Sequence, residues 1–196
     1  MALFDLGWSV PENRLDYLLA DEYLVVGAVT ADETGISFAE PPKGTLPEEA
    51  PSINDVPDQI LLVTDAGEFE MTLLKEEAPL TCRSFWYLAE TGFYDGIYFH
   101  RVIPGFVAQA GCPEGNGYGG PGYFIPAENN TVAYSRGVVG MADSGMDTGG
   151  SQFFIMLDSQ RRLDCRYTAF AVVDNPRCLD DIEIGTRILE IRRVNP

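Results

Sequence analysis

The stretch Tyr98-Phe99-His100-Arg101-Val102-Ile103-Pro104-Gly105-Phe106-Val107-Ala108-Gln109-Ala110-Gly111 lies near the middle of a chain of 196 residues. Together with Ile97, which precedes it, the stretch holds two short apolar runs, 97–103 and 106–110, separated by Pro104-Gly105. Short apolar runs that are bounded by proline and glycine are typical of β-strands. The stretch therefore predicts two strands in close succession, and it carries an arginine and the chain's single histidine.

The same rhythm of short apolar runs and glycines continues from residue 59 to the C-terminal end. A helix over 78–92 is expected to interrupt it, because Pro79 suits a first helical turn and Gly92 suits a helix end. Eight brief strands with such turn signals predict a closed antiparallel sheet, either a barrel or a sandwich. The expected strands are Gln59–Thr64, Glu68–Leu74, Ile97–Ile103, Phe106–Ala110, Val138–Met141, Gln152–Leu157, Ala169–Val173 and Thr186–Val194.

The first 57 residues differ in composition from the rest of the chain. They hold 11 acidic and 2 basic residues, and their last part, 40–51, is rich in proline and glutamate. We therefore expect an acidic N-terminal extension over 1–57 and a second domain over 58–196. Within the extension, the leucine spacing of 11–20 predicts a short amphipathic helix, and 23–29 predicts a strand or a buried tail. We hypothesise that the extension covers an apolar end of the sheet.

Overall charge and residue usage limit the classes of partner. The net charge is -17, so nucleic acid and anionic membranes are not expected to bind. No run of 18 to 20 apolar residues indicates a membrane span, and no signal segment is recognised, so a cytoplasmic location is expected. The four cysteines form no C-x-x-C pair, so we expect free thiols, no metal site and no cofactor.

Two longer motifs point to a known family. The stretch 98–111 and the later stretch Gly140–Ile155 resemble the two central motifs of the cyclophilins, in the same order and at a similar separation. Between them, residues 115–123 resemble the glycine-rich loop of bacterial-type members; without a P-loop lysine or a following helix, turn geometry explains this loop better than phosphate binding. The resemblance covers roughly residues 59–196. It implies a mainly β fold, a closed eight-stranded barrel with capping helices, and peptidyl-prolyl cis/trans isomerase activity.

The resemblance also implies a role for particular residues. Arg101 is expected to be catalytic, with its guanidinium donating a hydrogen bond to the prolyl nitrogen of a proline-containing peptide or an unfolded protein segment. His100 is expected to be a hydrogen-bonded shoulder of the groove and not a general base, because bond rotation transfers no obligatory proton. The expected proline pocket comprises Phe106, Val107, Phe154, Leu163 and Tyr167, and the residues expected to orient the peptide are Gln109, Ala142, Asp143 and Gln152.

The sequence departs from the family pattern in two segments and at Val107. Arg162 and Tyr167 stand where many members have tryptophan and histidine, so cyclosporin binding is expected to be weakened by Arg162. Val107 replaces a commoner methionine, which widens the pocket. Residues 174–183 leave little room for the family's second capping helix, which we expect to be shortened or lost.

Three functions remain open at this point. The leading hypothesis is an isomerase that assists protein folding. The alternative is a peptide-binding or chaperone module with weak isomerase activity. A third is that the extension recruits a partner or occludes the groove, with Leu46-Pro47 or Ala50-Pro51 docked in the chain's own site.

Overall fold

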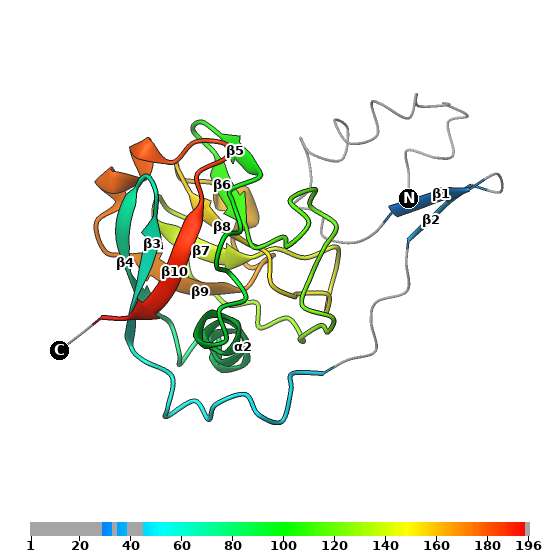
Figure 1. Cartoon of the computed structure of the whole chain (residues 1–196), viewed down its shortest axis with the longest axis horizontal. Helices are drawn as coiled ribbons and strands as arrows, with labels where there is room; N and C mark the ends of the chain where they lie inside the picture. Colours follow the sequence, from blue (N-terminus) through cyan, green and yellow to red (C-terminus); the bar gives the residue numbers. More distant parts are fainter. Residues whose placement is uncertain (1–28, 33–34, 39–44, 195–196) are drawn as a thin grey trace.

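The computed structural model of the chain describes residues 29–32, 35–38 and 45–194 (Figure 1). The helix predicted over 11–20 lies outside these residues, and so does 23–28 of the predicted strand or tail. Strand β1 (Val29–Asp32) pairs with β2 (Gly35–Phe38) in a small antiparallel sheet of its own.

The eight other strands form one antiparallel sheet in the order β10-β3-β4-β9-β7-β8-β6-β5. All eight predicted strands are present, although the one predicted over 97–103 is shorter and begins at Arg101. The prediction of a mainly β protein with an eight-stranded antiparallel sheet is therefore confirmed. The strands are β3 (Gln59–Thr64), β4 (Gly67–Leu73), β5 (Arg101–Ile103), β6 (Val107–Ala110), β7 (Val138–Met141), β8 (Phe153–Met156), β9 (Ala169–Val173) and β10 (Ile188–Arg193).

The two ends of the sheet meet through the segments that precede β5 and β10. Among the described strands, no ladder joins β5 to β10 directly. Instead, Phe99 N donates to Thr186 O at 2.8 Å, Ile188 N donates to Ile97 O at 2.8 Å, and Tyr98 forms an isolated bridge with Arg187. The sheet curls until these backbone segments pair.

Helix α2 (Pro79–Glu90) matches the helix predicted over 78–92. Pro79 lies in its first turn, and Gly92 follows its end with a φ of 73°, a left-handed conformation that glycine adopts without strain. The carboxylate of Glu128 accepts hydrogen bonds from Leu80 N at 2.9 Å and Thr81 N at 2.7 Å, and so satisfies amides that the first turn leaves open. The helix packs against β9 and β10 and lies across one open end of the curled sheet (Figure 1).

A second full helix is absent from the described C-terminal part of the chain. Its place is taken by η3 (Pro176–Asp181), a short 3-10 helix that buries Leu179. The expected shortening is therefore confirmed. Another 3-10 turn, η2 (Arg161–Leu163), lies between β8 and β9.

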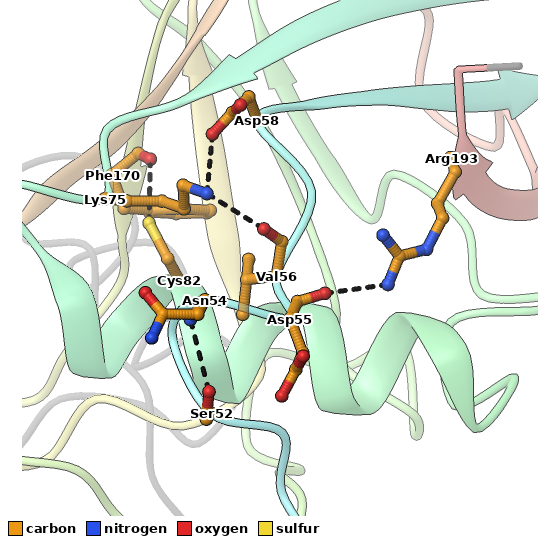
Figure 2. A network of polar contacts seen from close by, with 9 residues as sticks. All are labelled: Ser52, Asn54, Asp55, Val56, Asp58, Lys75, Cys82, Phe170 and Arg193. Atoms are coloured by element: carbon orange, nitrogen blue, oxygen red, sulfur yellow. Dashed lines mark hydrogen bonds and ion pairs between the residues drawn. The ribbon is translucent and has the colours of Figure 1, made fainter. Parts of the chain in front are cut away.

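Residues 50–58 lie against the domain that follows them, and the side chains of Lys75, Arg83 and Arg193 donate hydrogen bonds to their backbone. Lys75 Nζ donates to Val56 O at 2.9 Å and pairs with Asp58 at 2.5 Å, while Arg193 donates to Asp55 O at 2.7 Å (Figure 2). Arg83 of α2 donates to Pro51 O at 2.7 Å. Val56 is buried in the core, which supports the covering hypothesis for this part of the extension. Since Pro51 is bound to α2, the structure does not place it in the chain's own groove.

Strand β8 separates two apolar clusters. Side chains alternate between the faces of a strand, so Phe153 and Ile155 point to one face and Phe154 and Met156 to the other. We call the cluster that contains Phe153, and that α2 covers, the inner cluster. The outer cluster comprises Val107, Tyr134, Val138, Ala142, Phe154, Met156, Leu163, Tyr167 and Ala169, with Phe106, Val132 and Val172 at its margin.

Candidate active site

A single row of paired residues crosses four neighbouring strands. Arg101 of β5 lies opposite Gln109 of β6, Gln109 lies opposite Phe154 of β8, and Phe154 lies opposite Gly140 of β7. Directly paired residues of antiparallel strands place their side chains on the same face. The strand register therefore brings Arg101, Gln109 and Phe154 together on one face of the sheet.

Two buried amides hold the guanidinium of Arg101. The carbonyls of Gly117 and Gly119 accept hydrogen bonds from Gln152 Nε2 at 2.8 and 2.9 Å, so the side-chain oxygen of Gln152 faces Gln109. Gln109 Nε2 donates to that oxygen at 3.2 Å, and Gln109 Oε1 accepts from Arg101 Nη1 at 3.4 Å. The chain of amides thus orients Arg101 through neutral groups.

The predicted pocket residues gather in the outer cluster. Val107 and Phe154 are fully buried, Leu163 and Tyr167 are nearly so, and Phe106 is partly exposed. The ring of Tyr167 meets Phe154 edge-on, with 5.6 Å between the ring centres. Ala142 lies in the same cluster and is fully buried. The buried residues form a floor, and Phe106 stands at its accessible margin.

Sequence reasoning missed Tyr134. Its ring stacks on Phe154 at 5.6 Å, and its buried hydroxyl has no hydrogen-bond partner among the described residues. Gly140 makes room for this stack, because a Cβ there would lie 2.4 Å from the Phe154 ring and 2.6 Å from the Tyr134 oxygen. No sequence motif marks Tyr134, so only the fold could reveal its place.

His100 is half-buried beside Arg101. Burial and the neighbouring Arg101 charge lower the pKa of His100 to about 4, so the ring is neutral at pH 7. Its buried Nδ1 has no hydrogen-bond partner among the described residues. The prediction that His100 is a hydrogen-bonded shoulder of the groove names no ring atom and stays a prediction.

Asp143 follows Ala142 at the end of β7. Its Oδ1 accepts a hydrogen bond from Gly145 N at 3.0 Å, which closes a local turn. Burial raises the pKa of Asp143 to about 6, while the Gly145 amide and the charge of Arg166 oppose that rise. Of the predicted site residues, Asp143 is therefore the one whose charge changes most near neutral pH.

Phe106 lies between two guanidinium groups. The Cζ atom of Arg162 is 4.9 Å from the ring centre, and that of Arg101 is 5.7 Å from it. Cations at such distances are attracted to the negative face of an aromatic ring. Arg162 therefore lies within contact range of Phe106, at the position where the family often has tryptophan.

The remaining expectations concern turns, thiols and metals. Gly115, Gly117 and Gly122 have positive φ, in line with turn geometry for the glycine-rich loop. All four cysteines are free, as expected. In the described ranges no group of three or more potential ligands could hold a metal ion, and each helix is too short or too polar to cross a membrane.

Comparisons with known proteins agree with this geometry. The family model described as cyclophilin type peptidyl-prolyl cis-trans isomerase/CLD matches residues 59–193. A peptidyl-prolyl cis-trans isomerase of Synechococcus elongatus is 43% identical over 139 residues, which cover 69% of this chain and 96% of that protein. Peptidyl-prolyl cis-trans isomerase B of Bacillus subtilis is 50% identical over 114 residues, which cover 57% of this chain and 80% of that protein.

Solved structures lead to the same family. The crystal structure of a Cryptosporidium parvum cyclophilin type peptidyl-prolyl cis-trans isomerase aligns with a TM-score of 0.67 and 29% identity, covering 71% of this chain and 99% of that one. A second structure of that protein, in the presence of the dipeptide Ala-Pro, aligns equally well with 28% identity, covering 70% and 99%. The chain belongs to the cyclophilin-type peptidyl-prolyl cis-trans isomerases.

Proposed function

We propose that Arg101 and the outer cluster together catalyse rotation about X–Pro bonds in flexible protein segments. The observation that carries this proposal is the row Arg101–Gln109–Phe154, which places a fixed guanidinium beside an apolar floor. Arg101 can donate to the prolyl nitrogen once its lone pair has left amide conjugation. The apolar side chains can receive the proline ring and exclude water from it.

The energetics require both parts. An X–Pro bond rotates over a barrier of about 20 kcal/mol. A 10⁵-fold acceleration would need about 7 kcal/mol, whereas one charge-assisted hydrogen bond contributes about 1.5–3 kcal/mol. The remainder must come from the pocket and from clamping of the peptide backbone, which bind the twisted bond better than either planar isomer.

We assign the supporting residues by their contacts. Gln152 is fully buried and acts through Gln109, so it is a positioning residue. We assign neutral His100 and the buried Ala142 to the walls of the peptide groove, and Asp143 adds a titrating carboxyl group. The strongest alternative remains a peptide-binding or chaperone module, favoured by Arg162 and Tyr167, which both depart from the family pattern.

Replacing Arg101 separates these two functions. In Arg101→Ala we expect kcat/KM for a proline peptide to fall on the order of ten- to a hundredfold, with peptide affinity largely kept. Arg177→Ala, an exposed arginine on η3, is the matched control and should keep wild-type turnover. Unchanged turnover in Arg101→Ala would refute the catalytic role and favour the binding module.

Further features belong to the same proposal. The curled sheet acts as a closed barrel, supported by the pairing of 97–99 with 185–188, and residues 58–196 are the isomerase domain, with 45–57 fastened to it. Arg162 weakens cyclosporin binding; an affinity equal to that of tryptophan-bearing members would contradict this. The chain acts in the cytoplasm, without membrane or nucleic-acid partners, in keeping with its net charge of -17.

A further inference from the structure

We propose that the groove prefers substrates with an acidic side chain a few residues from the proline. This inference rests on the proposed function and names its substrate class. Its basis is the segment 161–167, which contributes Leu163 and Tyr167 to the outer cluster and places Arg162 beside Phe106. Leu163 and Tyr167 turn into the outer cluster, whereas Arg161, Arg162 and Arg166 are exposed to solvent.

Arg101 and Arg162 place two positive charges beside the ring of Phe106. The guanidinium groups of Arg162 and Arg101 both lie within 6 Å of the centre of Phe106. In the described part of the chain, no carboxylate lies within ion-pair distance of Arg162 or Arg166. An anionic side chain of a bound peptide would relieve this repulsion, whereas a cationic one would add to it.

The two carboxylates known to lie in this region are already engaged. Asp164 pairs with Arg161 at 3.8 Å and accepts a hydrogen bond from Tyr134 N at 2.8 Å. Asp143 accepts from Gly145 N. Among the described residues, neither carboxylate is therefore within ion-pair distance of Arg162.

This local arrangement contrasts with the charge of the whole chain. The net charge is -17, and only 13 residues are basic, yet the guanidinium groups of Arg101 and Arg162 lie beside the same ring. At physiological ionic strength, charges further apart than about 8 Å are largely screened. A peptide in the groove is therefore affected mainly by charges within that distance, and not by the net charge of the whole chain.

Geometry limits where the acidic residue can be. The Arg162 guanidinium is 4.9 Å from the centre of Phe106, which stands at the pocket margin. An extended peptide advances about 3.3 Å per residue, so the partner side chain belongs one to three residues from the proline. The direction of the bound peptide decides which side of the proline this is.

The test compares peptides that differ in one residue. Isomerisation is measured by exchange spectroscopy on proline peptides that are otherwise uncharged and carry Glu, Gln or Lys at one position, from three before to three after the proline. At one or two adjacent positions, kcat/KM for Glu should exceed that for Gln by about three- to fivefold, as exposed charge pairs allow, with Lys lowest. Salt at 1 M should abolish the difference.

Arginine variants assign the effect. In Arg162→Gln and Arg166→Gln, the ratio of Glu to Gln peptide should fall toward one, while Arg177→Gln should keep the wild-type ratio. Thermal unfolding verifies that each variant is folded, which is expected because these side chains are exposed. Equal rates for Glu and Gln peptides, or a preference that survives both variants, would overturn the inference alone. Absence of turnover on every peptide would instead overturn the proposed function.

Discussion

Phe153 and Phe154 are neighbours on β8, both fully buried, yet they belong to different parts of the molecule. Phe153 packs in the inner cluster, where its ring lies 5.4 Å from Phe85, 5.7 Å from Tyr94 and 6.3 Å from Phe99. Phe154 packs in the outer cluster between Tyr134 and Tyr167. One strand thus serves the core with one face and the proposed site with the other.

The outer face keeps features that cost stability. The Tyr134 hydroxyl and His100 Nδ1 are buried without partners among the described residues, and Asp143 is desolvated. Such groups lower stability, and they concentrate at functional sites more than elsewhere. The inner cluster has fewer buried polar atoms without partners, although the Trp86 Nε1 atom there also lacks one within the described part of the chain. Because side chains alternate between the two faces of a strand, one face of the sheet can provide stability while the other carries the proposed chemistry.

The largest expected effect is a loss of stability from a substitution in the inner cluster. Phe153→Ala should lower the free energy of unfolding by about 3–5 kcal/mol, because it leaves a cavity among three aromatic rings. If that variant does not fold, Phe153→Leu and Phe154→Leu give the milder comparison. We expect Phe153→Leu to lose more stability in denaturant unfolding, and Phe154→Leu to lose more kcat/KM per folded molecule. Equal losses on both scales would contradict the division between the two faces.

A smaller effect concerns the pH dependence of the outer face. The pKa of Asp143 in the folded chain, about 6, lies above its ordinary value of 3.8, so the folded state binds this proton more tightly than the unfolded state does. The resulting stability is present at low pH and is lost as the pH rises from about 4 to about 6.

Asp143→Asn removes this dependence. From pH 4 to pH 7, the unfolding free energy of the variant should gain about 1 kcal/mol relative to wild type, allowing for solvent screening. Unfolding curves at both pH values measure the gain. A constant difference between variant and wild type would show that burial does not disfavour the Asp143 carboxylate.

Much of the fold was predictable because it depends on local pattern. The eight strands and α2 follow from short apolar runs and their flanking glycine and proline, and the family motifs name Arg101, Phe106 and Phe154. Other features join residues far apart in sequence, and no local pattern encodes them. The Glu128 cap on α2 spans 47 residues, and Tyr134 meets Phe154 only because the sheet brings them together.

Peptide binding mapped by nuclear magnetic resonance tests the central assignment most directly. When a proline peptide is added to isotope-labelled protein, the largest amide shift changes should fall in β5, β6 and residues 161–167, with those of β3 and β4 nearly unchanged. Largest changes instead at the surface hollow lined by Trp86, Glu90 and Arg193 would contradict the assignment of the site to the outer face.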